Sequence, residues 1–387
     1  MAKNHRRHRL FAAVAALVLT GTVITACTKH EPTPSPVAES KPLRIGIAYG
    51  NRLTGLSDKG LASALDVAVE VGARWVRADL SWRDVQPDGP GDYRWRQFDR
   101  IVAAAAKRHL TVLPILGYTP PWARPAGCDD EKCHPADPAA FADFAAAAAQ
   151  RYAPSGIHTW EVWNEPNLPD FWKPAPDPGT YTDLLRLTSR ALRHQDPSAY
   201  VIFGGLAAVH TGGTRISQSD FLAAVSARGG NRFVNAVAYH PYTFPYLPSD
   251  TTGRGTTWEA IDSAPDSLEH VLSVYGTPGL PVWITEYGAP TGGPGAATDG
   301  RPENILSTTK HVTEERQAEI AADSVRTAAG TPHVQALFWF SDHDLGTDTS
   351  SEENFFGLRR ADGSAKPALG ALRRAVAALR DEHVHPS

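Results

Sequence analysis

Two glutamates stand where apolar, strand-like segments end. Glu165 lies in 159–167, TWEVWNEPN, in which Val162 and the tryptophans favour a strand and Pro166 cannot continue a hydrogen-bonded ladder. Glu286 is the acid near the end of the apolar segment 280–290, LPVWITEYGAP. Two carboxyls held roughly 5 Å apart cleave glycosidic bonds with retention, since one donates a proton to the leaving oxygen and the other attacks the anomeric carbon. One such glutamate is commonly a solvated loop residue, but the repeated pattern favours a catalytic pair.

The elements that must position this pair follow from the alternation of short apolar runs with longer helical patterns, which begins at Leu43. Eight such units can be counted, and in a closed parallel barrel every strand delivers its carboxyl end to the same face. An α/β sandwich would also alternate, but it explains neither eight units nor acids after the fourth and seventh strands. We therefore predict a single (β/α)8 barrel with long strand-following loops. The expected strands are 44–49, 75–80, 111–116, the segment before Glu165, 200–204, 235–240, the segment carrying Glu286, and 334–340.

The composition is that of an ordinary globular protein. The chain has 387 residues, of which 42% are hydrophobic and 21% charged, and its formal net charge is −4. Such a balance offers no basic surface for a polyanion. We expect no nucleic-acid partner, and we expect a monomer.

The N-terminus has the pattern of an export signal. Basic residues among the first nine precede an apolar run at 10–23, which is too short for a comfortable membrane span. The run ends at 24–27, ITAC, which resembles a bacterial lipobox with Cys27 as the lipidated residue. The predicted parts are a lipoprotein signal peptide at 1–27, a proline-rich tether at 28–42, a catalytic domain at 43–382 and a tail at 383–387. We expect a lipid anchor on the outer face of the bacterial cytoplasmic membrane or in the cell envelope; a plain secretory peptide is the alternative.

Cys128 and Cys133 are the remaining cysteines. An even pair in an exported protein predicts a disulfide that closes a small loop. A metal site is the alternative, and His134 adjoins the pair, but no second cluster of cysteine or histidine accompanies it. We therefore expect no metal.

The sequences WNEPN at 163–167 and ITEYG at 284–288 resemble the retaining glycoside hydrolases of clan A, especially families 39 and 5. The resemblance extends over roughly 44–380. It implies that Glu165 is the acid/base, that Glu286 is the nucleophile, and that no metal or organic cofactor is required.

Five further positions match this resemblance. Arg77, on the second expected strand, would hydrogen-bond the nucleophile and lower its pKa, although a surface ion pair is the plain alternative. Asn164 would bind the sugar 2-hydroxyl. His240 and Tyr242 would flank the nucleophile. Trp339, on the eighth strand, would form the floor of the subsite where the bond breaks, or else belong to the barrel core.

Ten tryptophans are many for this length, and several lie in strand-following loops. Sugars present C–H faces that pack on aromatic rings. We provisionally assign Trp82, Trp122, Trp172 and Tyr118 to carbohydrate binding.

Taken together, these residues predict a retaining glycoside hydrolase that cleaves a β-linked oligo- or polysaccharide outside the cell. A transglycosylase on the same scaffold and a non-catalytic glycan receptor are the alternatives.

Overall fold

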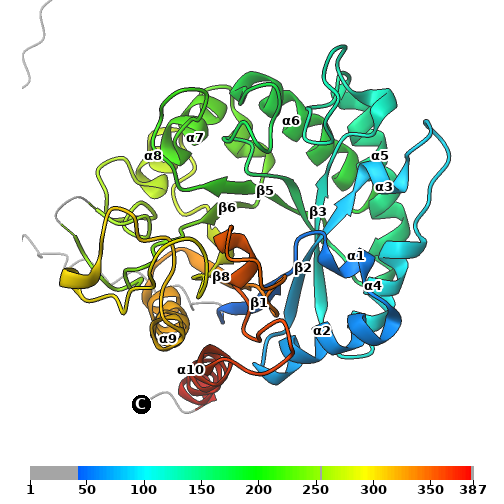
Figure 1. The fold of residues 1–387 in the computed structure, drawn as a ribbon. Helices are drawn as coiled ribbons and strands as arrows, with labels where there is room; N and C mark the ends of the chain where they lie inside the picture. The colour runs from blue at the N-terminus through cyan, green and yellow to red at the C-terminus, as the bar shows by residue number, and fades with distance from the viewer. Residues whose placement is uncertain (1–41, 253–254, 385–387) are drawn as a thin grey trace, which may run out of the picture. The chain divides into compact units, whose positions relative to one another are not determined.

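The computed structural model describes residues 42–252 and 255–384. The predicted signal peptide, Cys27 and the tether up to residue 41 lie outside the described residues. Eight parallel strands pair in chain order and close into a barrel, which confirms the predicted fold (Figure 1). Their bounds are β1 Arg44–Ala48, β2 Trp75–Ser81, β3 Thr111–Gly117, β4 Thr159–Asn164, β5 Tyr200–Ala207, β6 Ala236–His240, β7 Val282–Tyr287 and β8 Val334–Phe340.

Helices surround the barrel in chain order, so the colour of Figure 1 runs around the ring. Polar residues cap the starts of several helices. Asp137 accepts a hydrogen bond from the N–H of Ala139 at the start of α5, and Thr313 accepts one from the N–H of Arg316 at the start of α9. The α-helices are α1 Arg52–Gly55, α2 Asp58–Glu70, α3 Trp82–Val85, α4 Arg96–Ala106, α5 Pro138–Tyr152, α6 Pro178–Gln195, α7 Gln218–Ser226, α8 Leu268–Val274, α9 Glu314–Gly330 and α10 Pro367–Val384. Short 3₁₀ turns are η1 Pro121–Ala123, η2 Ala153–Ser155, η3 Gly230–Phe233, η4 Pro302–Asn304 and η5 Glu352–Phe355.

The core has an inner and an outer layer. Inside the barrel, small residues such as Ala236 and Ala336 leave room for Trp283 and Phe338. Gly46 pairs with Phe338 across β1 and β8, and a Cβ at Gly46 would stand 2.3 Å from that ring. Larger aliphatic and aromatic side chains fill the outer layer between strands and helices. This dense packing fixes the strand ends that carry the candidate site.

Cys128 and Cys133 form a disulfide, as predicted, with their Cα atoms 6.1 Å apart. The loop that it closes lies against the segment after β4, because Lys173 donates its N–H to the carbonyl of Lys132 at 3.0 Å. The disulfide therefore holds Lys132 at a defined place on the face formed by the strand ends.

Two ends differ from the predicted bounds by more than one residue. Strand β5 continues to Ala207, beyond the expected residue 204, and α10 continues to Val384, beyond the expected domain boundary at 382. Among the described residues, no helix combines the length and apolar character that crossing a membrane requires.

Candidate active site

Glu165 follows the last residue of β4. Its φ of +44° and the φ of +73° at Trp163 lie in the left-handed region that side-chain-bearing residues rarely adopt. The backbone N–H of Glu165 donates to the carbonyl of Gly205 at 2.8 Å, so β5 holds the turn in place. The strand end is thus shaped to aim this carboxyl into the barrel mouth.

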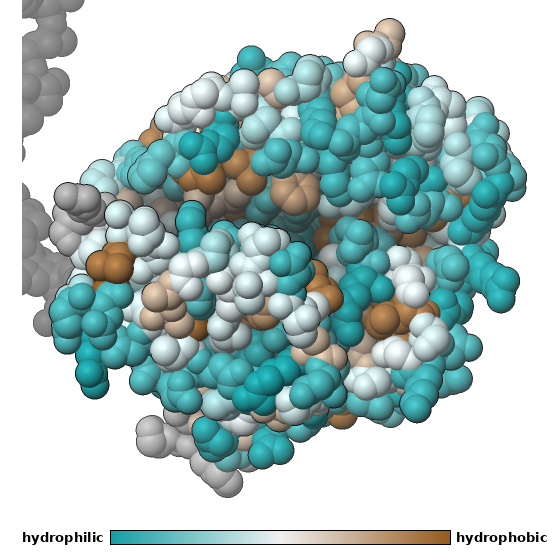
Figure 2. Space-filling model, viewed as in Figure 1, coloured by the Kyte–Doolittle hydropathy of each residue, from teal (hydrophilic) through white to brown (hydrophobic). Residues whose placement is uncertain are grey.

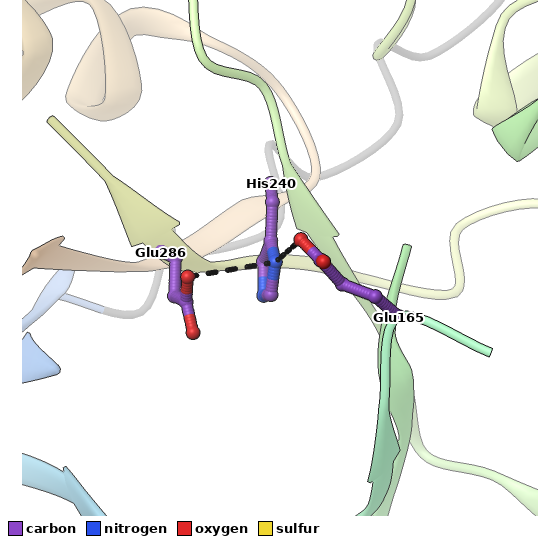
Figure 3. A group of neighbouring side chains, drawn as sticks. All are labelled: Glu165, His240 and Glu286. Carbon is purple, nitrogen blue, oxygen red and sulfur yellow. Dashed lines mark hydrogen bonds and ion pairs between the residues drawn. The ribbon is translucent and has the colours of Figure 1, made fainter. Parts of the chain in front are cut away.

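Glu286 lies in β7, one residue before the strand ends. Figure 3 shows its carboxylate facing that of Glu165, with His240 between them. One carboxylate oxygen from each glutamate and one ring nitrogen of His240 all lie within 4.8 Å of one another. The structure therefore brings together the two glutamates that the sequence predicts as a pair.

Arg77 of β2 lies fully buried beneath the two glutamates. Its Nη1 donates to Glu286 Oε1 at 2.5 Å, which is the contact expected for this residue. Its Nε and Nη2 donate to the two oxygens of Glu161 at 2.7 and 2.9 Å, and Nη2 also donates to Asn164 Oδ1 at 2.7 Å. The buried guanidinium is therefore compensated by two carboxylates and holds one of them, Glu286, in place.

Tyr242 contacts the other oxygen of Glu286. Its hydroxyl donates to Oε2 at 3.0 Å. Burial alone would raise the pKa of Glu286, but the charges of His240 and Arg77, with the hydrogen bonds from Arg77 and Tyr242, lower it below its usual value. Glu286 is thereby kept ionised, as a nucleophile must be.

Tyr242→Phe is expected to move the acid limb of the kcat/KM profile to higher pH. A carboxylate that loses a donor has a higher pKa, so its ionisation requires a higher pH. We expect kcat/KM at the optimum to fall about tenfold, since a hydrogen bond to a charged group contributes roughly 1.5–3 kcal/mol. The pH dependence of aryl glycoside hydrolysis measures both effects; an acid limb at its original pH would contradict the assignment.

His240 lies beside Glu286, as expected, but it contacts Glu165 more closely. Its Nδ1 lies 2.9 Å from Glu165 Oε1 and 3.8 Å from Glu286 Oε2. Its Nε2 lies 3.0 Å from the hydroxyl of Thr285. A Cβ on Gly205 would stand 2.1 Å from Nε2, so only glycine leaves room for the ring there.

The hydrogen-bond chain beyond His240 assigns its tautomer. Glu161 accepts from Arg77 as an ionised carboxylate, so the Thr285 hydroxyl, 3.3 Å away, donates to it. The Thr285 oxygen then accepts from His240 Nε2–H. One proton is left for the contact between Nδ1 and Glu165, carried by either group. The contact thus holds one proton that His240 and Glu165 share.

Thr285→Val is expected to lower kcat/KM about tenfold for a phenyl glycoside and less for a 2,4-dinitrophenyl glycoside. The valine leaves Nε2 without its acceptor, and only the poorer leaving group depends strongly on proton donation. Thr285→Ser should restore most of the loss. Equal losses for both substrates would contradict the proton-holding role.

A cavity of about 600 Å³ opens above these residues. In Figure 2 the molecule is hollowed near the centre of the face toward the viewer, and both hydrophilic and hydrophobic residues surround the hollow. Such a mixed lining suits a sugar, which has apolar C–H faces and polar hydroxyls. The aromatic lining residues are Tyr118, Phe171, Tyr242, Phe244, Phe340 and Phe356, and the polar ones include Asp79, Lys132, Asn164, Glu165, Glu286, Glu352 and Glu353.

Asp79 of β2 is a buried lining residue that sequence reasoning missed. It is 7% exposed, and its carboxylate makes no hydrogen bond or ion pair within the described part of the chain. Burial raises its pKa from 3.8 to about 6, against the opposing charges of Arg77 and Lys132. At pH values between 3.8 and about 6, Asp79 keeps its proton in the folded protein but has lost it in the unfolded chain. The free energy of unfolding therefore falls as pH rises through this range.

Asp79→Asn is therefore expected to stabilise the protein at pH 8 by about 1–3 kcal/mol, because asparagine cannot ionise. At pH 4 the gain should disappear. Urea denaturation at both values measures the difference, with Asp88→Asn on the exposed loop after α3 as the matched control. Equal or lower stability of Asp79→Asn at pH 8 would contradict the buried, unpaired carboxylate.

The structure corrects the expectation for Trp339. Its side chain is 1% exposed and packs against Tyr287 in the outer core layer. Side chains alternate along a strand, so the next residue, Phe340, points inward and lines the cavity instead.

The three loop tryptophans also lie elsewhere. Trp82 and Trp172 are fully buried; Trp82 packs against Phe141 and Phe144 of α5. Trp122 is half-buried, and its indole N–H donates to a backbone carbonyl at 2.7 Å. None of the three lines the cavity, whereas Tyr118 does. These tryptophans pack into the protein and anchor their loops, whereas sugar binding would require their rings to be exposed in the cavity.

Glu165, His240 and Glu286 are also the described residues whose donor atoms lie close enough together to hold a metal ion. Both oxygens of Glu286 already accept hydrogen bonds from Arg77 and Tyr242. A metal ion would have to compete with these donors and with the adjacent guanidinium charge. The donor set therefore suits proton transfer better than metal binding.

Comparison with known proteins places this geometry in a family. The model of the cellulase family, glycosyl hydrolase family 5, matches residues 48–316, more than half of the 387-residue chain. The chain belongs to glycoside hydrolase family 5. A β-xylosidase of Geobacillus stearothermophilus is 28% identical to this family 5 chain over 256 residues, covering 57% of the chain and 48% of that protein. The chain thus spans about half the length of this curated relative.

Solved structures share the barrel of this family 5 member. A family 39 glycoside hydrolase from Bacteroides cellulosilyticus WH2 has a TM-score of 0.64 at 22% identity, covering 88% of this chain and 65% of that one. A family 5, subfamily 18 protein from Streptomyces cattleya, in complex with GlcNAc, has a TM-score of 0.64 at 21% identity. The match covers 89% of this chain and 82% of that one. At these identities the likeness concerns the fold alone.

Proposed function

We propose that this family 5 chain hydrolyses β-glycosidic bonds by double displacement, with retention of configuration. The observation that carries the proposal is the approach of the Glu165 and Glu286 carboxylate oxygens to within 4.8 Å. Retaining enzymes hold their carboxyl groups about 5 Å apart, whereas inverting enzymes separate them by roughly 6.5–9.5 Å to admit a water.

In the first step, a Glu286 oxygen attacks the anomeric carbon while Glu165 protonates the departing oxygen. The C–O bond to the aglycone breaks and an ester to Glu286 forms. In the second step, Glu165 takes a proton from water, the water oxygen attacks the same carbon, and the ester bond breaks. Both residues return to their starting states. His240 holds the proton at Glu165 before the first step, and between the steps Glu165 is ionised and acts as the base.

The substrate proposed is an oligo- or polysaccharide, supported by the mixed lining of the cavity and by the relatives named above. A transglycosylase would use the same steps with a sugar acceptor in place of water. A binding-only receptor would need neither the ionised nucleophile nor its buried partners, so the arrangement around Glu286 favours an enzyme.

We also propose that the protein is exported and anchored through a lipid on Cys27. The basic start, the apolar run and the sequence ITAC support this proposal, and the disulfide is compatible with an oxidising compartment. Palmitate labelling of the wild type that persists in Cys27→Ser would overturn it.

The function is tested by incubating full-length protein, purified in detergent, with a panel of aryl β-glycosides and oligosaccharides and separating the products by chromatography. Cleavage with release of free sugar supports hydrolysis. Transfer products alone would indicate the transglycosylase. Binding without cleavage across the panel would indicate the receptor.

A further inference from the structure

Several polar groups of the cavity take no part in the mechanism above, and three of them come from β2 and from the loops after β3. Asp79 lies on β2, Tyr118 follows β3, and Lys132 lies in the disulfide loop. Resting on the proposed function, we infer that Asp79 and Lys132 together bind two neighbouring hydroxyl groups of a neutral sugar, held beside the cleaved bond. This subsite selects the sugar ring, whereas Glu165 and Glu286 perform the reaction.

Asp79 supplies the acceptor side of this subsite. Asp79 as a whole is more than nine-tenths buried; its side chain lines the cavity, and its carboxylate has no hydrogen-bonding partner within the described residues. A carboxylate in that position is costly unless a ligand satisfies it. Sugar hydroxyls are suitable ligands because each can donate one hydrogen bond to it.

Lys132 supplies the donor side. Its Nζ lies 3.1 Å from the centre of the Tyr118 ring, a cation–π contact that fixes the ammonium group at the cavity wall. It also lies 3.3 Å from Glu131, yet it forms no ion pair with Asp79 in the described structure. Its charge is nevertheless near enough to lower the pKa of Asp79. The two groups thus face the same space without neutralising each other by contact.

The charge of the cavity sets the class of sugar. Lys132 is the one cationic side chain among its described lining residues, which also include Asp79, Glu165, Glu286, Glu352 and Glu353. A uronic acid would bring another carboxylate into this acidic space and be repelled. An amino sugar would replace one hydroxyl with an ammonium group, which cannot accept a hydrogen bond from Lys132. A neutral ring with adjacent free hydroxyls fits both sides, since a carboxylate accepts from such a pair and an ammonium donates to it.

The test uses the full-length protein and 4-nitrophenyl β-glycosides of xylose, glucose, mannose, glucuronic acid and glucosamine. A neutral sugar is expected to react with the highest kcat/KM, at least about 100-fold above the glucuronide. Fastest cleavage of the glucuronide or the glucosaminide would overturn the assignment. Absence of all cleavage would instead overturn the proposed function, so the two failures are distinguishable.

Deoxy analogues of the best neutral substrate then locate the contacts. In the wild type, removal of one hydroxyl that Asp79 or Lys132 binds should lower kcat/KM about 10- to 100-fold. In Asp79→Asn and Lys132→Met, kcat/KM for the parent substrate should fall by about the same factor. For these variants, kcat/KM for the deoxy analogue should be only slightly lower than for the parent substrate. Asp88→Asn and Lys107→Met are the matched surface controls. If removing the hydroxyl lowered kcat/KM as much in both variants as in the wild type, the proposed subsite would be overturned. Residues with a merely structural role would leave this fall in kcat/KM unchanged.

Discussion

Glu286→Ala is expected to lower kcat/KM for a 2,4-dinitrophenyl β-glycoside by at least about 10⁴-fold, since it removes the carboxylate that forms the glycosyl ester. Azide should restore turnover, because it fits the space left by the carboxylate and attacks the anomeric carbon from that side. The product should be the α-glycosyl azide, identified by NMR.

Glu303→Ala, an exposed glutamate on η4, is the matched control and should retain full activity. Near-normal activity of Glu286→Ala without azide would remove Glu286 from the nucleophile role. A β-glycosyl azide would contradict attack from its side of the ring.

Glu165→Ala is expected to have an effect that depends on the leaving group. A phenyl glycoside needs a proton on its departing oxygen and should lose about 10³- to 10⁴-fold in kcat/KM, near the upper limit for general acid catalysis. A 2,4-dinitrophenyl glycoside departs without that proton, so its first step should lose much less. Azide should rescue the slow second step and yield the β-glycosyl azide, opposite to the product from Glu286→Ala.

Steady-state and pre-steady-state kinetics with both substrates measure this difference, and Asp170→Ala, at an exposed position after β4, is the control. Equal losses for the two leaving groups would show that Glu165 is not the proton donor.

The barrel could be predicted because its sequence signals are local and repeated. Each strand is a short apolar run followed by a loop, and each major helix has a polar first residue or an amphipathic pattern. The strand Val334–Phe340 has the bounds that the sequence predicts. Glu165 and Glu286 were recognisable as a pair because each stands at the end of a largely apolar strand.

The lining of the site was harder to predict because it depends on the direction of each side chain. Trp339 and Phe340 are adjacent aromatic residues, and only the barrel register decides that Phe340 faces the cavity. Trp82 and Trp172 follow strands, but their loops fold back onto the barrel and bury them. Sequence pattern does not reveal such tertiary packing.

Glu161 and Asp79 carried a weaker signal that was overlooked. Each is an acid inside an apolar strand, where an unpaired charge is costly and therefore needs a function or a partner. Glu161 has its partner in Arg77, and Asp79 has none in the described residues.

The stereochemistry of the released sugar tests the central claim most directly. Proton NMR of wild-type hydrolysis of an aryl β-glycoside, recorded before the anomers equilibrate, identifies the product formed first. Two carboxylates within 4.8 Å of each other predict the β-anomer. Initial formation of the α-anomer would show a single displacement by water and would contradict the double-displacement mechanism.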